Sequence, residues 1–219
     1  QAAAQQGVKR LVHLSSVAVV SGNSTQPLTD DMPYKAINSY GESKIAAEKQ
    51  VLAWRQQGLP SAILRPAIVY GEREYRVLNP FLTAIQNRKL PILDIAEMES
   101  PLQLAYADNV ADALELALTV ENALEGTFLI ADPEPITLRR LLEIAYQTLG
   151  IKIPVVPRWL AQRLMQNPNI KAKLMELFRP NYFDQSRALQ RLGYHPSHPT
   201  EPSLKQTIRL WQTQPQAQR

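Results

Sequence analysis

The sequence predicts an α/β fold with parallel strands. Three short apolar runs, at residues 9–14, 61–65 and 126–131, have the length and composition of buried strands, and the second ends before Pro66. Helical patterns separate these runs, and parallel strands need such crossovers because a tight hairpin cannot join them. From residue 151 onward no further strand is predicted, and prolines separate short helical stretches. We therefore expect a C-terminal part that is mainly helical.

The helices are predicted from the residues at their ends. Ser39 and Glu42 have the spacing of a capping box, in which the serine caps the helix and the glutamate reaches back. Thr137 and Gly150 bound a later helix, and Asp108 is interpreted as the N-cap of another. The predicted helices cover residues 39–57, 79–87, 108–119, 138–149, 158–166, 169–178, 184–192 and 203–212.

Composition excludes several classes of protein. Hydrophobic residues make up 45% and charged residues 20%, which is ordinary globular composition and unlike a disordered chain or a coiled coil. The net charge of +4 is spread along the chain without a basic block, so we do not expect a nucleic acid partner. The absence of cysteine excludes disulfides and thiolate metal sites and is consistent with a reducing compartment, so we expect a cytoplasmic protein without a metal. No apolar run approaches the roughly 20 residues of a membrane span.

Tyr40 and Lys44 form a candidate proton-transfer pair. They are four residues apart at the start of a predicted helix, so their side chains project from one face. A phenol, with a reference pKa of about 10, is a weak acid or base at neutral pH. An ammonium held beside it favours the phenolate, and the positive end of the helix acts in the same direction. A tyrosine and a lysine with this spacing occur by chance in many proteins. Whether the pair indicates catalysis therefore depends on the neighbouring segments.

The order of the neighbouring segments supplies this context. Ser15-Ser16 lies at the C-terminal end of the first predicted strand, where parallel α/β sheets bind ligands. Residues 21–38, rich in Gly, Asn, Pro and Asp, predict a long loop before the capped helix. Arg65-Pro-Ala-Ile-Val-Tyr-Gly71 then continues from the second strand, and Tyr106-Ala-Asp-Asn-Val-Ala111 opens a later helix.

In this order the segments resemble the extended short-chain dehydrogenase/reductase superfamily, in particular its NAD-dependent epimerase/dehydratase group. The resemblance covers most of the chain. It implies the C-terminal part of a doubly wound Rossmann-type parallel sheet, followed by a small, mainly helical substrate-binding lobe. The segments that carry it are Gly7-Val-Lys-Arg-Leu-Val-His-Leu-Ser-Ser16, Ser39-Tyr-Gly-Glu-Ser-Lys-Ile-Ala-Ala-Glu48, Leu64-Arg-Pro-Ala-Ile-Val-Tyr-Gly-Glu72 and Leu104-Ala-Tyr-Ala-Asp-Asn-Val-Ala-Asp-Ala113.

The resemblance implies roles for the matching residues. Tyr40 would be the catalytic acid/base, Lys44 would bind the nicotinamide ribose hydroxyls, and Ser16 would hydrogen-bond the substrate oxygen. Many epimerases carry the catalytic Ser or Thr one position later, where this sequence has Val17, while steroid-type members use the second serine of the pair. NAD or NADP is the expected cofactor. The residues expected to contact it are Leu14, Ser15, Tyr40, Lys44, Pro66, Ala67, Ile68 and Val69.

The resemblance also predicts the domain organisation. Residues 1–132 would belong to the NAD(P)-binding domain, with 72–104 partly in the substrate lobe, and residues 133–219 would form that lobe. No glycine-rich dinucleotide loop can be drawn, because even the nearest glycines, Gly58 and Gly71, are 13 positions apart. The resemblance begins at the fifth strand of the family's sheet. We therefore expect the first βαβ units, roughly a hundred residues at about 30 per unit, upstream in a parent protein, and expect this chain alone to be inactive.

Two substrate classes compete within the resemblance, sterol-like compounds and nucleotide sugars. Arg65-Pro stands where well-known nucleotide-sugar epimerases tend to show Asn-Pro, and Leu64–Glu72 resembles the 3β-hydroxysteroid dehydrogenase-like branch, although some sugar-nucleotide members share it. The segments Val155–Ala161 and Leu174–Phe178 supply apolar helices that suit an apolar substrate or simply pack on the sheet. Arg65 could face a substrate anion or form a structural ion pair.

A second hypothesis is a non-catalytic, cofactor-binding or RNA-associated member of the same fold. Such atypical members usually lose the Tyr or the Lys, and this sequence has both, so an NAD(P)-dependent dehydrogenase/reductase or epimerase with a small-molecule substrate is favoured. The family often dimerises through the helix that carries the pair, which makes a homodimer an expectation. We expect the tryptophans to lie in the core; they are Trp54, Trp159 and Trp211.

Overall fold

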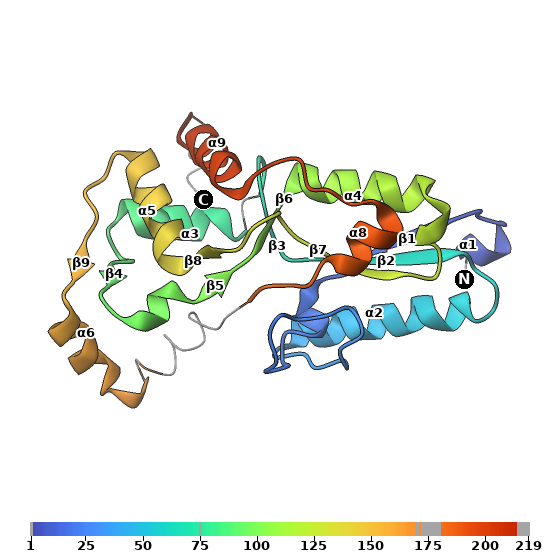
Figure 1. Cartoon of the computed structure of the whole chain (residues 1–219), viewed down its shortest axis with the longest axis horizontal. Coiled ribbons are helices and arrows are strands. Elements are labelled where there is room, and N and C mark those ends of the chain that lie inside the picture. The colour runs from blue at the N-terminus through green and yellow to red at the C-terminus, as the bar shows by residue number, and fades with distance from the viewer. Residues whose placement is uncertain (1, 75, 170, 172–180, 214–219) are drawn as a thin grey trace. The chain divides into compact units, whose positions relative to one another are not determined.

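The computed structural model describes residues 2–74, 76–169, 171 and 181–213 (Figure 1). The chain divides into two compact units, each assembled from separate stretches. The first unit contains Gln1–Val69, Gln103–Pro133 and Asn181–His198, and the second contains Tyr70–Leu102, Glu134–Pro180 and Pro199–Arg219.

The first unit is built on a three-stranded parallel sheet in the order β1-β2-β7. Its strands are β1 (Leu11–Leu14), β2 (Ser61–Pro66) and β7 (Thr127–Ile130). Leu14 pairs with Leu64, and Pro66 pairs with Ile130, so the strands end at one edge of the sheet. The predicted α/β fold with parallel strands is confirmed. The second strand, however, includes Pro66, because a proline is tolerated at the end of a strand.

Helices cover both faces of this sheet. Figure 1 shows α2 (Ser39–Arg55) on one side and α4 (Ala107–Thr119) on the other. All six residues of β2 are buried, as expected for a central parallel strand with both faces covered. The largest fully buried side chains around the sheet are apolar and come from several elements; they include Leu28, Leu64, Phe128, Leu129 and Ile130.

Two predicted helix caps differ from the structure by one position or more. Asn38, not Ser39, caps α2: its backbone is extended, and its side-chain oxygen accepts the Gly41 N–H at 2.9 Å. Ser39 already has helical geometry, so its hydroxyl is not placed to cap. Asp108 lies inside the first turn of α4, where its carboxylate favours the helix dipole without capping, and Tyr106 precedes the helix.

The segment Asn181–His198 packs with the first unit, although we expected it in the C-terminal lobe. It contains α8 (Ser186–Leu192), which ends at Gly193 in the left-handed conformation. The Tyr194 hydroxyl donates to the Ala131 carbonyl oxygen at 3.0 Å, directly after β7. Leu28 in the long loop pairs with Phe183. These contacts extend the first unit with residues that are distant in sequence.

The second unit is mainly helical, with two pairs of very short strands. Thr137 caps α5 by accepting the Arg140 N–H, and Gly150 ends it in the left-handed conformation, as predicted. The helices are α3 (Leu78–Gln86), α5 (Leu138–Leu149), α6 (Arg158–Met165) and α9 (Thr200–Thr213). The strands are β4 (Ile92–Leu93), parallel to β9 (Val155–Val156), and β5 (Pro101–Leu102), antiparallel to β8 (Ile136–Thr137).

Several smaller expectations are corrected here. The strand β9 lies beyond residue 151, where none was predicted, because two residues beside β4 leave no periodicity to detect. Trp211 is buried, but the Trp159 side chain is 66% exposed and does not belong to the core. The helix predicted at residues 169–178 lies almost entirely outside the described residues. The remaining short elements are α1 (Ala2–Gln5), η1 (Val17–Val19), β3 (Ile68–Tyr70), η2 (Ala96–Glu99), β6 (Leu104–Tyr106) and η3 (Glu121–Ala123).

Candidate active site

Tyr40 and Lys44 lie on the first turns of α2, beside the carboxyl edge of the sheet. Leu14 is the last residue of β1, and its carbonyl oxygen accepts a hydrogen bond from the Lys44 ammonium at 3.3 Å. The ammonium also lies 5.8 Å from the centre of the Tyr40 ring, within the range of a cation–π contact. The Tyr40 side chain is 53% exposed. The structure therefore presents a phenol to solvent with an anchored cation beside it.

Ser15 and Ser16 continue directly from β1. The Ser15 N–H donates to the Leu64 carbonyl oxygen at 2.7 Å, which extends the pairing of β1 with β2, and the residue is buried. Ser16 is extended, and its hydroxyl oxygen accepts the Ala18 N–H at 3.2 Å, so it caps the short helix η1. Val17 is buried in the core. Of these positions, Ser16 is the one with a half-buried hydroxyl that retains a proton to donate.

Gly41 allows η1 to pack closely against α2. A Cβ atom at this position would lie 2.7 Å from the Ala18 carbonyl oxygen and 2.8 Å from the Ala36 Cβ, both too close for a side chain. Because Ser16 caps η1 and α2 carries Tyr40, this close packing links the two candidate groups. Sequence reasoning missed the role of Gly41, although a glycine inside a helix is unfavourable without a packing reason.

The residues expected beside the nicotinamide follow β2. Pro66 and Ala67 are buried, and the Ala67 N–H donates to the Ile130 carbonyl oxygen at 2.8 Å. Ile68 is 40% exposed, Val69 is half-buried, and Leu14 on the neighbouring strand is 41% exposed. Leu14 at the end of β1 and Ile68, two residues beyond the end of β2, are thus exposed apolar side chains.

A buried ion pair joins α2 to β2. Glu48 lies two turns after Tyr40 on α2 and is fully buried. The Arg65 guanidinium donates from Nε and Nη2 to both Glu48 carboxylate oxygens, at 2.9 and 2.7 Å. Burial alone raises the pKa of Glu48, but the hydrogen bonds from Arg65 hold it below its ordinary value. Of the two roles considered for Arg65, binding a substrate anion or forming a structural ion pair, the structure shows the ion pair.

The long loop before α2 is bound to the same ion pair. The Tyr34 hydroxyl donates to Glu48 at 2.7 Å, and burial together with this carboxylate raises the pKa of Tyr34 to about 12. Arg65 also donates to the Asp30 carbonyl oxygen at 2.8 Å. The Asp30 carboxylate accepts the Leu129 N–H at 2.5 Å, and burial raises its pKa to about 6. Sequence reasoning missed this cluster, although Tyr40, Lys44 and Glu48 share the helical spacing of one face.

His13 lies on β1 next to Leu14. Its Nε2 atom is buried and has no hydrogen-bond partner among the described residues. Burial lowers the pKa of His13, and the nearby Lys44 ammonium lowers it further, so the ring is neutral at physiological pH. A neutral imidazole beside Lys44 adds no competing positive charge at this edge of the sheet.

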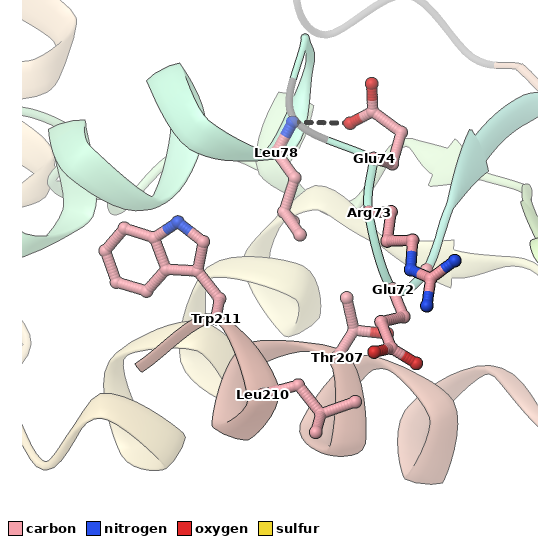
Figure 2. A pocket seen from close by; sticks show the side chains of 8 residues that line it. Glu72, Arg73, Glu74, Leu78, Thr207, Leu210 and Trp211 are labelled. Carbon is pink, nitrogen blue, oxygen red and sulfur yellow. Dashed lines mark hydrogen bonds between the residues drawn. The ribbon is translucent and has the colours of Figure 1, made fainter. Parts of the chain in front are cut away.

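The second unit contains a small, open hollow of its own (Figure 2). Glu74 accepts the Leu78 N–H at 2.8 Å and so holds the start of α3, and the Trp211 indole donates to Asn79. The first of these bonds stabilises the start of α3, and the second joins α9 to α3. Both therefore engage polar groups in or beside the hollow. The residues that line it are Gly71, Glu72, Arg73, Glu74, Leu78, Thr207, Leu210 and Trp211.

Comparison with known proteins identifies the family. Residues 1–131 match the sequence profile of the NAD dependent epimerase/dehydratase family. The chain belongs to this family. Its predicted membership of the extended short-chain dehydrogenases is confirmed. Among the described residues, no helix is long and apolar enough to cross a membrane, and no three His, Asp or Glu residues cluster as metal ligands.

Curated relatives include enzymes named for different substrates. The chain is 28% identical over 230 residues to a 3 beta-hydroxysteroid dehydrogenase/Delta 5-->4-isomerase of Mycobacterium tuberculosis, covering 92% of this chain and 60% of the relative. It is 26% identical over 151 residues to an N-acetylglucosaminyl-diphospho-undecaprenol 4-epimerase of Escherichia coli, covering 68% of this chain and 45% of the relative. The chain thus spans about half of the length of these relatives.

Solved structures share the fold of the family. A UDP-glucuronic acid 4-epimerase from Bacillus cereus in complex with NAD superposes with a TM-score of 0.75 at 16% identity, covering 96% of this chain and 64% of that protein. A UDP-glucose 4-epimerase from Thermotoga maritima gives a TM-score of 0.71 at 21% identity, with coverages of 96% and 65%. At these identities the likeness supports the Rossmann-type fold alone.

Proposed function

We propose that this protein is an NAD(P)-dependent dehydrogenase/reductase or epimerase that acts at a secondary alcohol or ketone, with Tyr40 as the acid/base. The observation that carries the proposal is the position of Lys44, which bonds the end of β1 and lies 5.8 Å from the Tyr40 ring. A positive charge held beside an exposed phenol is the arrangement that the acid/base proposal requires. Tyr40 would take the proton of a substrate hydroxyl during oxidation and return it to a carbonyl oxygen during reduction.

Ser16 would hold the reacting substrate oxygen. Its oxygen accepts the Ala18 N–H, which orients the hydroxyl while leaving its own proton free to donate. The close packing of η1 on α2 at Gly41 supports a position near Tyr40. A hydrogen bond to the developing alkoxide strengthens as charge accumulates, which is how such a donor lowers a barrier.

The residues at this edge suit a nicotinamide dinucleotide. Lys44 has ammonium protons beyond the one given to Leu14 and would hold the ribose hydroxyls together with the Tyr40 hydroxyl. Exposed Leu14 and Ile68 supply apolar contacts for a planar ring. When bound, the cofactor supplies or accepts the hydride. The other residues proposed to line it are Ser15, Pro66, Ala67 and Val69.

The substrate class is proposed as either sterol-like or a nucleotide sugar, as the names of the relatives suggest. Both amino groups of the Arg65 guanidinium are engaged with Glu48 and Asp30, and its side chain is buried. Arg65 is therefore not available to bind a substrate phosphate. This observation removes one candidate for diphosphate binding and favours the apolar class. Turnover of a nucleotide sugar without turnover of a sterol would contradict it.

The experiment that tests the acid/base proposal is Tyr40→Phe, which removes the hydroxyl and keeps the ring. Like every measurement of rate or NAD(P) binding proposed below, it is made in the full-length protein. General acid/base groups typically contribute about 10²–10⁴-fold, so we expect kcat to fall by at least a hundredfold, with a much smaller loss of NAD(P) affinity because Lys44 still holds the ribose. Tyr182→Phe is the matched control, because this half-buried tyrosine lies outside the proposed site. A loss below about tenfold would refute the role of Tyr40. Cofactor binding without hydride transfer by the unmodified protein would favour a non-catalytic member.

A further inference from the structure

The stretch between Glu143 and Glu176 contains no acidic residue. Within it, the described part of the second unit carries four lysine and arginine side chains, all exposed; they are Lys152, Arg158, Arg163 and Lys171. None of the four forms an ion pair with another described residue. Because they are spread over about twenty positions, they do not form a block in the sequence. No acidic residue in this stretch offsets the positive charge, and the nearest one across β9 is Asp94, whose N–H donates to the Val156 carbonyl oxygen at 3.0 Å and whose carboxylate pairs with Arg139.

Exposed apolar side chains lie among these cations. Trp159 is 66% exposed, and Val155 in β9 is 59% exposed. Leaving these side chains in water forgoes the free energy that burying a large apolar side chain would contribute. Tryptophan combines a large apolar ring with an N–H donor, and it is enriched where an apolar phase meets water.

The geometry of α6 places Trp159 between two arginines. Ala161 is buried, and Leu160, Leu164 and Met165 are half-buried, which defines the inward face. At about 100° per residue, the exposed residues Arg158, Gln162, Trp159 and Arg163 then occupy one arc of about 140° on the opposite side. We name these four residues the α6 surface. In Figure 1, α6 follows β9 directly along the chain.

We propose that the α6 surface docks on an anionic lipid membrane. Its indole would enter the interface between headgroups and acyl chains, and Arg158 and Arg163 would contact lipid phosphates on either side. Earlier in the same stretch of chain, Val155 would add a second apolar contact and Lys152 a further contact with lipid phosphates. This inference is independent of the proposed oxidoreductase activity, because it uses none of the residues at the Tyr40 edge.

A membrane fits these observations better than a nucleic acid. Both partners attract cations, but phosphate backbones give no burial to an aliphatic side chain such as Val155. Each Lys or Arg near an anionic surface strengthens binding about fivefold. Because the α6 surface has only two arginines, we expect it to bind weakly. We therefore expect reversible association that depends on anionic lipid and on salt.

The test is flotation of the protein with vesicles of phosphatidylglycerol and phosphatidylcholine, compared with vesicles of phosphatidylcholine alone. We expect binding to the anionic vesicles only, and a marked loss between roughly 0.1 M and roughly 0.5 M salt. Arg158→Glu with Arg163→Glu should weaken binding by at least about twentyfold. Trp159→Ala should weaken it by about tenfold. Thermal melting checks that the exposed substitutions leave the protein folded.

Matched controls separate a docking surface from general charge. Lys9→Glu with Lys49→Glu changes the net charge by the same amount as the double arginine variant, at two exposed lysines of the first unit. Leu118→Ala removes an exposed apolar side chain of the first unit and is the control for Trp159→Ala. Both controls should bind within about twofold of the unmodified protein. Equal losses in the controls would overturn the proposal, as would tighter binding to a single-stranded oligonucleotide than to vesicles. A self-associating protein that becomes monomeric on Trp159→Ala, without vesicle binding, would also overturn it.

Discussion

Arg65 and Glu48 form a bidentate ion pair inside the first unit, with side-chain exposures of 5% and 0%. Glu48 lies four residues beyond Lys44 on α2, and Arg65 lies on the central strand. The pair therefore ties the helix that carries Tyr40 and Lys44 to the sheet whose edge forms the candidate site. The Tyr34 hydroxyl donates a further hydrogen bond to Glu48, so both oxygens of the buried carboxylate are hydrogen-bonded.

Arg65→Met should destabilise the protein by about 3–5 kcal/mol, because it leaves the Glu48 charge buried without its cation. Urea unfolding of the variant measures this change. The matched variant is Glu48→Leu combined with Arg65→Met, which replaces both charges by apolar groups and should recover much of the lost stability. Equal stability of the single and double variants would contradict the prediction.

Asp30→Asn should change how stability depends on pH. Burial raises the folded-state pKa of Asp30 from 3.8 to about 6, so this group stabilises the folded state only when protonated. Its contribution is fully present below about pH 4 and is lost as pH rises through about 6, a loss of about 2–3 kcal/mol. An asparagine keeps an oxygen for the Leu129 N–H but does not titrate.

The measurement is the free energy of unfolding of both proteins between roughly pH 4 and pH 8. The difference, Asn variant minus unmodified protein, should rise across this window and level off above about pH 7. A flat difference for Asp30→Asn would show that its carboxylate is solvated.

Gly41→Ala should destabilise the protein by about 1–3 kcal/mol, although alanine is normally better than glycine in a helix. The added Cβ would lie 2.7 Å from the backbone oxygen of Ala18, and a backbone atom cannot rotate away. The short helix η1 must then shift, and Ser16 shifts with it. We expect kcat to fall more than the cofactor affinity. A more stable variant with unchanged kcat would contradict this prediction, because it would show that η1 can move aside without displacing Ser16.

Lys44→Met should weaken NAD(P) binding by about tenfold to a hundredfold, since hydrogen bonds from a charged group contribute about 1.5–3 kcal/mol. It should also lower the rate, because the same ammonium lies beside Tyr40. Isothermal titration with each dinucleotide, together with steady-state kinetics, measures both effects. Lys49→Met, an exposed position on the same helix, is the control. Similar behaviour of the two variants would make Lys44 an ordinary surface residue.

The sequence was most informative where structure depends on near neighbours. Thr137 and Gly150 were predicted as the ends of α5 and are its ends, because capping bonds close within one turn. The same local reasoning placed the α2 cap one residue late, since Asn38 and Ser39 are both capable of capping. The extended backbone of Asn38 decides between them. The catalytic and cofactor roles of Tyr40, Lys44 and Ser16 remain predictions from the motif.

The three strands of the main sheet, the helices between them, the family and the spacing of Tyr40 and Lys44 on one helix could all be predicted from the sequence. The buried partner of Arg65 and the exposure of Trp159 could be seen only in the folded chain. The reason is the separation of the groups involved. Arg65 and Glu48 are 17 residues apart in the chain, and Asp30 and Leu129 are 99 apart. Such contacts depend on how packed strands, helices and loops bring distant segments together, which no local pattern of residues records.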